Sequence, residues 1–342
     1  MSIEASVGLA ARTSLGLGGP ARFLATARSE GDIVEALAWA DDQQLDTWVL
    51  GGGSNVVVPD LGLPGLVLAV ALAGIEQLST GSPVLLRVQA GEGWDTLVRY
   101  AVTHDLQGLE CLSGIPGLVG ATPIQNVGAY GQEVADTIVS VRAFDRVERR
   151  FVELAAADCE FGYRVSRFKA REAHRFVISA VTFALHRGKA PEVRYPELQR
   201  ALERTPHSLQ ATREAVLALR RSKSMLLDPM AENGRSCGSF FMNPIVAPDQ
   251  AQAVQRRFPD ETLPRYPQVD GSVKLPAAWL IERSGFAKGY RSGRVGISSR
   301  HSLALVCHAG ATTQDLLELA ARVRAGVLAR SGVELTPEPV IW

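Results

Sequence analysis

The stretch VLGGGSNVVV, residues 49–58, places three successive glycines between two runs of β-forming residues. A P-loop would need a lysine after its last glycine, and this stretch contains none. The dinucleotide fingerprint would need a helix to begin at the last glycine, whereas Val56, Val57, Val58 and Pro59 favour a strand. Two interpretations remain open: a plain hairpin turn, or an anion site in which successive backbone N–H groups form a concave nest.

Strands and helices are predicted to alternate outward from this loop. Capping boxes predict helix starts at Ser29, with Asp32 three residues later, and at Thr312, with Asp315 three residues later. The helix after Thr312 is expected to end at Gly332. Periodicity predicts further helices and strands; these are helices at residues 94–106, 211–221 and 276–285 and strands at residues 84–88 and 176–185. The pattern indicates a mixed α and β protein of several domains.

The composition excludes several classes of function. The chain has 342 residues, with 36 Lys plus Arg and 36 Asp plus Glu, so it has no electrostatic basis for non-specific binding to nucleic acid or to a membrane surface. Four widely spaced cysteines without a CxxC motif indicate a reducing compartment, and isolated histidines predict no metal site. The start lacks an apolar signal segment, and the charge-free run at residues 61–75 is too short and broken to span a bilayer. We therefore expect a cytoplasmic protein.

Two later segments stand out by composition. Residues 108–134 are rich in glycine and proline without being polar, which indicates tightly packed backbone near a ligand rather than a solvent loop. Residues 190–208, APEVRYPELQRALERTPHS, combine prolines and charges, which predicts a boundary or a mobile surface excursion.

Several motifs together carry a resemblance to a known family. They are GLECLSGIPGLVGATPIQNVGAYGQEV at residues 108–134, FGYRVSRFK at 161–169, GSFFMNP at 238–244, DGSVKLPAAWLIERSG at 270–285 and LTPEP at 335–339. In this order and spacing they resemble the UDP-N-acetylenolpyruvoylglucosamine reductase family, flavoenzymes of peptidoglycan precursor synthesis. The resemblance runs from about Ser14 to the C-terminus.

The resemblance implies an α+β fold with a vanillyl-alcohol-oxidase-type, two-part FAD-binding domain and a C-terminal α+β substrate-binding domain. The expected division is residues 1–70 for the first FAD-binding subdomain, 71–205 for the second, and 206–342 for the substrate domain, whose final residues return to the active site. In such a fold a glycine loop between strands holds the pyrophosphate of FAD, bound non-covalently. We expect a monomer that binds neither nucleic acid nor a membrane.

The resemblance also assigns cofactor contacts. The pyrophosphate is expected on Gly51, Gly52, Gly53, Ser54 and Asn55. The flavin ring is expected along a segment where small residues let backbone N–H groups approach it; the positions are Ser113, Gly114, Ile115, Pro116, Gly120, Ala121, Ile124, Asn126 and Gly128.

The implied reaction has two half-reactions, in which NADPH reduces the flavin and the enolpyruvyl group of UDP-N-acetylglucosamine enolpyruvate is then reduced. It requires a clamp on the substrate carboxylate and a proton donor over C2. Arg164 matches the family arginine on the carboxylate, and Glu338 matches the glutamate that assists it, with a pKa expected to be raised by burial. Ser239 matches the proton donor, whereas the neighbouring Cys237 is off the motif position and is interpreted as structural.

The remaining substrate contacts are expected at Tyr195, Lys223, Asn243 and Arg291. Tyr195 would close over the uracil end on a mobile loop, and Lys223 suits a diphosphate as a point charge. Taken singly, each residue has an ordinary interpretation, such as a surface ion pair, a turn or a tail residue. Two other functions also remain open: a flavin oxidase of the same fold that passes electrons to oxygen, and a non-catalytic protein that binds nucleotide sugars.

Overall fold

The computed structural model describes residues 1–228 and 230–342. The chain packs into two compact units, and each unit mixes helices and strands, as the predicted α+β class requires. Unit 1 contains Met1–Gly8, Pro20–Gly53 and Leu63–Ser222, and unit 2 contains Leu9–Gly19, Ser54–Gly62 and Lys223–Trp342. The last crossing of the chain between the two units follows Ser222, and the three-part division at residues 70 and 205 remains a prediction.

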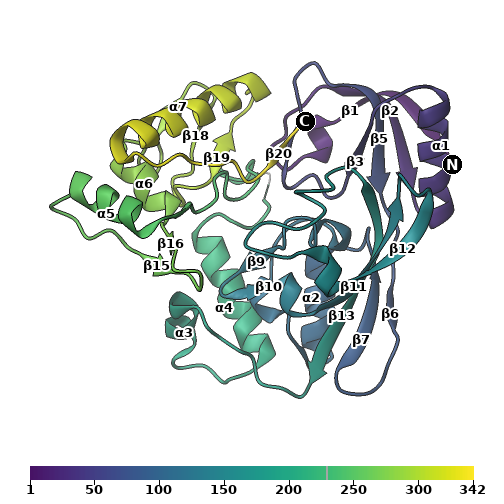
Figure 1. The fold of residues 1–342 in the computed structure, drawn as a ribbon, viewed down its shortest axis with the longest axis horizontal. Coiled ribbons are helices and arrows are strands. Elements are labelled where there is room, and N and C mark those ends of the chain that lie inside the picture. Colours follow the sequence, from purple (N-terminus) through teal and green to yellow (C-terminus); the bar gives the residue numbers. More distant parts are fainter. Residues whose placement is uncertain (229) are drawn as a thin grey trace. The chain divides into compact units, whose positions relative to one another are not determined.

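A four-stranded sheet begins unit 1. Its order is β1-β2-β5-β3, in which β2, β5 and β3 run parallel. The bounds are β1 Ile3–Gly8, β2 Pro20–Ala27, β3 Thr47–Leu50 and β5 Leu63–Val70. Helix α1, Glu30–Asp42, lies beside β2 and β5 (Figure 1) and starts with the predicted capping box between Ser29 and Asp32. The glycine loop leaves the sheet at the end of β3.

The second sheet of unit 1 is antiparallel, with the order β12-β11-β13-β7-β6 and β8 paired to β13. Its strands are β6 Ile75–Gln77, β7 Val84–Gln89, β8 Leu106–Gln107, β11 Ile138–Asp145, β12 Arg150–Ala155 and β13 Phe176–Arg187. Helix α1 is tied to this sheet as well, because Glu30 accepts hydrogen bonds from Arg142 on β11 and Ser179 on β13. Both sheets therefore contribute to one apolar core.

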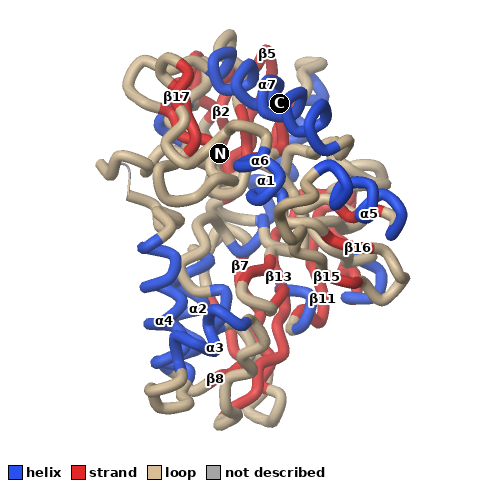
Figure 2. Tube along the Cα trace, turned by 90° about the vertical axis from the view of Figure 1, so that its left-hand side faces the viewer, coloured by secondary structure: helices blue, strands red, loops and turns tan. Residues whose placement is uncertain are grey.

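Three helices lie together on one side of strands β7 and β13 (Figure 2). They are α2 Trp94–Thr103, α3 Pro196–Leu202 and α4 Leu209–Ser222. Residues 190–208, predicted as a boundary or a mobile surface excursion, contain α3, whose Leu198 and Leu202 are buried with Cys111 and Val216. Two leucines four residues apart give the helix one apolar face, and Pro196 fits its first turn. Two short strands, β9 Gly128–Ala129 and β10 Gln132–Glu133, form a hairpin in the glycine-rich segment.

Unit 2 combines short strands with helices around a second core. Its strand pairings are β14-β16-β15, β17-β18-β19 and β20-β4. The bounds are β4 Val56–Val57, β14 Ile245–Val246, β15 Tyr266–Pro267, β16 Val273–Lys274, β17 Arg291–Ser292, β18 Val295–Ile297, β19 Leu305–Cys307 and β20 Val340–Ile341, with helices α5 Pro248–Arg257, α6 Ala277–Arg283 and α7 Thr313–Ser331. Helix α7 has the predicted capping box and ends at Gly332, which has a left-handed φ of 75°.

The last strand of unit 2 pairs with the strand that follows the glycine loop. Val340 and Ile341 in β20 pair in parallel with Val56 and Val57 in β4. The core of unit 2 also takes in Leu15 and Leu17. Across the described parts of the chain, no helix combines the length and apolar character needed to cross a membrane.

Candidate functional site

The glycine loop presents open backbone amides. Gly51, Gly52 and Gly53 follow β3, and their N–H groups donate to no other described residue. Gly53 has a φ of 63°, in the region that favours glycine. Backbone polar groups of a folded chain are normally paired, so three successive open amides form the kind of concavity that binds an anion. The plain-turn interpretation gives no reason for three open donors.

The loop packs directly on the second glycine-rich segment of unit 1. A Cβ added to Gly52 would lie 2.7 Å from the Cα of Gly117, and one added to Gly51 would lie 3.5 Å from the Cβ of Ala121. The contact at Gly52 is closer than a real Cβ can approach, so only glycine fits there. The expected pyrophosphate loop and the expected flavin segment therefore lie side by side.

Both backbone polar groups of Gly114 are hydrogen-bonded within unit 1. Its N–H donates to Asp95 Oδ1 at 2.6 Å, and its carbonyl oxygen accepts from Arg220 Nε at 3.2 Å. The Gly114 amide is therefore committed to the protein, and a position of Gly114 beside the flavin remains a prediction. The amides of Ile115 and Gly117 donate to no described residue, so open donors begin one position further along the segment.

Two other predicted flavin neighbours hold the segment together. The Ser113 side chain is fully buried and donates to the Glu110 carbonyl at 2.6 Å. The Asn126 side chain is buried and donates to Glu133 at 2.6 Å and to the Gly162 carbonyl at 3.0 Å, while its oxygen accepts from the Ala135 amide at 3.1 Å. Asn126 also has a positive φ of 46°, which asparagine tolerates better than most residues. Its side chain is therefore committed to the protein.

Close backbone packing explains several of the small residues. The Gly120 amide donates to the Ala90 carbonyl at 2.9 Å, and a Cβ on Gly120 would lie 2.5 Å from the Ala90 Cβ. Ala121 ends the same short 3-10 turn, and the carbonyl of Ile124 accepts from the Ser166 hydroxyl. Pro116 lies between the two open amides, those of Ile115 and Gly117. The expectation of tightly packed backbone in residues 108–134 is confirmed.

Arg164 lies against the same segment. Its Nη2 donates to the Gly128 carbonyl at 2.7 Å and its Nη1 to the Asn126 carbonyl at 3.5 Å, and its guanidinium lies 5.4 Å from the Tyr163 ring centroid. The residue has a left-handed φ of 57°. Unit 1 therefore brings the predicted carboxylate clamp next to the predicted flavin segment.

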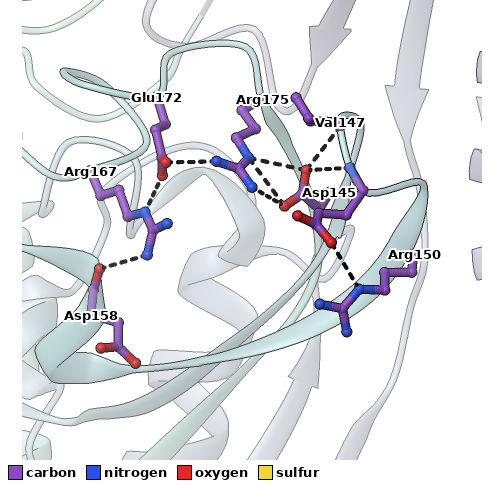
Figure 3. Close-up of polar contacts among 8 residues, drawn as sticks. Asp145, Val147, Arg150, Asp158, Arg167, Glu172 and Arg175 are labelled. Carbon is purple, nitrogen blue, oxygen red and sulfur yellow. Dashed lines mark hydrogen bonds and ion pairs between the residues drawn. The ribbon is translucent and has the colours of Figure 1, made fainter.

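A network of ion pairs fixes the loop that carries Arg164 (Figure 3). This loop joins β12 to β13, and Glu172 within it bonds to both Arg167 and Arg175. Arg175 continues the network to Asp145, with Nη2–Oδ2 at 2.6 Å and Nε–Oδ1 at 3.0 Å. The Arg175 bond holds the pKa of Asp145 below its usual value, with burial acting in the opposite direction. The loop is thus anchored at the strand ends while Arg164 lies at the segment.

Ser239 and Glu338 belong to unit 2, where the backbone brings them together. The amide of Glu338 donates to the Phe240 carbonyl at 2.9 Å, and Phe241 forms a β-bridge with Pro337. Phe240 and Phe241 are 0% and 1% exposed and belong to the core of unit 2. Ser239 follows Gly238, whose φ of 77° turns the chain. The predicted proton donor and the predicted glutamate are therefore close in this unit.

Cys237 lies beside this pair without the features of a nucleophile. Burial, with smaller contributions from Cys307 and Glu338, raises the pKa of the Cys237 thiol far above its usual range. A buried neutral thiol is inert, which supports the structural interpretation of Cys237.

The expected substrate residues are dispersed over both units. Tyr195 is the N-cap of α3, is 41% exposed, and meets the Tyr130 ring edge-on at 5.5 Å. Asn243 Oδ1 accepts from the amide of Ala277, the first residue of α6, at 2.9 Å. Lys223 begins the third segment of unit 2, directly after α4. The Arg291 side chain makes an exposed ion pair with Glu232, at 3.4 Å.

Three polar residues around Gly114 were missed by the reasoning from sequence: Asp95, Arg213 and Arg220. Arg213 and Arg220 are seven residues apart in α4, and this spacing of two helical turns places both on one face. A pair of arginines on one face of a helix that also has a buried apolar residue, Val216, was the available signal.

The geometry fits FAD. A loop with three open amides suits a diphosphate, and it packs on a segment whose next open amides, at Ile115 and Gly117, suit a polar ring edge. A family model described as "FAD binding domain" matches residues 21–149. This unit is therefore the FAD-binding part of a flavin-dependent oxidoreductase.

Comparison with known proteins defines the family. A model described as "UDP-N-acetylenolpyruvoylglucosamine reductase, C-terminal domain" matches residues 228–342. Proteins of that name from Thermobifida fusca and Saccharopolyspora erythraea are each 47% identical, over 99% and 97% of this chain and 98% and 94% of their own length. The crystal structure of the Thermus caldophilus reductase is 26% identical with a TM-score of 0.70, covering 100% of this chain and 99% of that chain. The chain belongs to the UDP-N-acetylenolpyruvoylglucosamine reductase family.

Proposed function

We propose that this chain catalyses the NADPH-dependent reduction of the enolpyruvyl group of UDP-N-acetylglucosamine enolpyruvate to give UDP-N-acetylmuramate for peptidoglycan and cell wall synthesis. Family membership over nearly the whole chain supports the reaction. The observation in the structure that carries it is the set of open amides at Gly51, Gly52 and Gly53, packed on the segment at Gly117. This arrangement provides a cradle for the diphosphate of FAD.

FAD, when bound, supplies hydride transfer from NADPH to C3 of the enolpyruvyl group. The residues of the chain must then bind the substrate carboxylate and deliver a proton to C2. Arg164 is the proposed clamp, because a guanidinium stays charged and can bond a carboxylate with two parallel N–H donors. Its bonds to the carbonyls of Gly128 and Asn126 set the plane of the guanidinium before substrate arrives.

Ser239 is the proposed proton donor and Glu338 the residue that assists at the carboxylate. The backbone bond from Glu338 to Phe240 holds the two side chains on neighbouring stretches of chain, and the buried pair Phe240 and Phe241 gives those stretches a rigid base. A hydroxyl is a weak acid, yet the negative charge that develops at C2 is basic enough to accept its proton.

The remaining substrate contacts are proposed with narrower roles. Asn243 contributes its amide nitrogen, since its oxygen already holds the first residue of α6. Lys223 and Tyr195 are proposed for the diphosphate and uracil ends. Arg291 can leave Glu232 at little cost, because exposed ion pairs contribute about 1 kcal/mol or less.

We also propose that the protein works in the cytoplasm as a monomer and binds neither nucleic acid nor a membrane. The balanced charge and the absence of disulfides among its four cysteines support this setting. Size-exclusion chromatography with light scattering tests the oligomeric state, and a dimer would refute that part of the proposal.

The Ser239→Ala variant tests the reaction and separates its half-reactions. The purified protein should show bound-flavin absorbance, and NADPH should bleach it at a near-normal rate in the variant. Turnover of the enolpyruvyl substrate should fall about 100- to 10,000-fold, the usual contribution of a positioned proton donor. Ser272→Ala, in an exposed turn of unit 2, is the matched control and should keep full activity.

Several outcomes would contradict the proposal. A colourless protein that binds no added FAD would exclude the flavoenzyme. Fast reoxidation by oxygen without need of the enolpyruvyl substrate would favour an oxidase. Equal slowing of both half-reactions in Ser239→Ala would remove its role as proton donor.

A further inference from the structure

Three charged side chains hold the peptide at Gly114 from two helices. Asp95, in the first turn of α2, accepts the Gly114 N–H with Oδ1 at 2.6 Å. Arg213 of α4 bonds both oxygens of the same carboxylate, each at 2.6 Å. Arg220, two turns further along α4, donates to the Gly114 carbonyl at 3.2 Å. Both backbone groups of Gly114 are thus bonded to side chains that are far from it in sequence.

The ion pair between Asp95 and Arg213 is bidentate, and its arginine side chain is largely buried. The Arg213 side chain is 11% exposed and the Asp95 side chain 39% exposed. Burial alone would raise the pKa of Asp95, but the bonds from Arg213 and the Gly114 amide outweigh it and hold the pKa below its usual value. The carboxylate therefore stays ionised and keeps its bond to Gly114, since a charged acceptor makes the stronger hydrogen bond.

The first turn of α2 also donates two hydrogen bonds to the glycine-rich segment at residues 108–134. The Trp94 amide donates to the Gly117 carbonyl and its indole Nε1 donates to the Leu112 carbonyl, both at 3.0 Å. The carbonyls of Leu112, Gly114 and Gly117 are bonded, whereas the amides of Ile115 and Gly117 in the same segment are open. Gly52 packs on Gly117. The position of Asp95 therefore sets where the open amides lie relative to the glycine loop.

We propose that Asp95 and Arg213 are positioning residues for the flavin, which hold the Gly114 peptide so that the open amides of Ile115 and Gly117 face the ring. This role rests on the FAD site proposed above. Neither residue touches the reacting atoms. Arg213 acts through Asp95, and Asp95 acts through the Gly114 amide.

The bonds from Arg213 to Asp95 and from Asp95 to the Gly114 amide form a brace on the Gly114 peptide. Asp95→Ala and Arg213→Met remove this brace, while Asp95→Asn and Arg213→Lys keep part of it. For the first two variants the dissociation constant of FAD should rise about 10- to 100-fold, the effect of losing a charge-assisted hydrogen bond. The conservative variants should recover most of this loss. In both FAD-free and FAD-loaded protein, the amides of residues 113–118 other than Pro116 should exchange hydrogen faster in Asp95→Ala than in the wild type. Turnover should fall through kcat, with the KM for the enolpyruvyl substrate little changed.

Arg142→Met is the matched control. Arg142 bonds both oxygens of Glu30 at 2.6 and 2.9 Å, in the same unit but on β11, and its side chain is 34% exposed against 11% for Arg213. It should lower stability without changing FAD affinity or exchange at residues 113–118. The role is overturned if Asp95→Ala and Arg213→Met leave FAD affinity and exchange unchanged, or if Arg142→Met changes them equally. A wild-type protein that binds no FAD would refute the proposed function instead, and exchange in the FAD-free protein would still test the brace.

Discussion

The two glycine-rich regions of unit 1 use their backbone in opposite ways. In the loop at Gly51, Gly52 and Gly53, three successive amides are open. In residues 108–134 most of the small or unusual positions serve the protein itself: Gly114 is bonded at both ends and the Asn126 side chain makes three hydrogen bonds. One region is glycine-rich to leave donors exposed, and the other is glycine-rich to let chains approach closely. Composition alone does not separate these two uses.

Asn126→Ala should give the largest effect and lies on the packing side of this comparison. It leaves the Gly162 carbonyl, the Ala135 amide and Glu133 without the partner they have now. We expect the free energy of unfolding to fall by about 3 kcal/mol, from several buried groups losing their bonds. Urea denaturation measures it.

The visible spectrum of bound flavin should be the same in Asn126→Ala as in the wild type. A changed spectrum at unchanged stability would contradict this and would assign Asn126 to direct contact with the flavin.

Gly52→Ala tests the loop with the open amides and should change the affinity for FAD. Its Cβ would meet the Gly117 backbone at 2.7 Å, so the loop or the segment must move. Overpacking of this kind costs about 1–3 kcal/mol, and here it should weaken FAD binding, as measured by quenching of flavin fluorescence on titration. Gly81→Ala is the control, because a Cβ there meets nothing within 4 Å. Unchanged FAD affinity in Gly52→Ala would show that the loop is a plain turn.

Glu110→Gln should give the smallest effect, visible as a pH dependence. Glu110 is 1% exposed, and burial raises its pKa, although the Gly108 N–H bond opposes this. Below the unfolded pKa of about 4.3 both states are protonated. As pH rises from there through the raised folded pKa, the unfolded state loses its proton first, so stability falls. Glutamine removes this loss and should be more stable at pH 7 by about 1 kcal/mol.

Thermal unfolding between pH 4 and pH 8 tests the Glu110 effect. The difference between variant and wild type should grow as pH rises, and the exposed Glu203→Gln control should show no such trend. A difference that shrinks with rising pH would contradict the sign.

Local signals in the sequence predicted the local structure well. The capping boxes at Ser29 and Thr312 are present, and the helix expected at residues 276–285 is observed as α6, Ala277–Arg283. The glycine loop lies between strands, because valines cannot continue it as a helix. These features depend on residues a few positions apart, which is the range over which propensity and capping act.

Features that depend on distant residues could not be read in the same way. No residue near Gly114 in sequence indicates that Asp95 and Arg220 would bond its amide and its carbonyl, since these two residues lie in the distant helices α2 and α4. The resemblance to the family supplied Arg164, Ser239 and Glu338, and their roles remain predictions. The structure adds that Arg164 lies on unit 1, whereas Ser239 and Glu338 are held together on unit 2.

The pairing of β20 with β4 has a consequence for the order of events during synthesis. Val56 and its strand partner Val340 lie far apart in sequence, so Val340 is made much later than Val56. Contacts so far apart in sequence form late, after the loop between them has been closed. The strand that follows the glycine loop is thus completed only after Val340 has been made. FAD capture should therefore wait until Val340 has been made, and a chain that lacks residues 340–342 should have a folded first unit that retains the cofactor poorly.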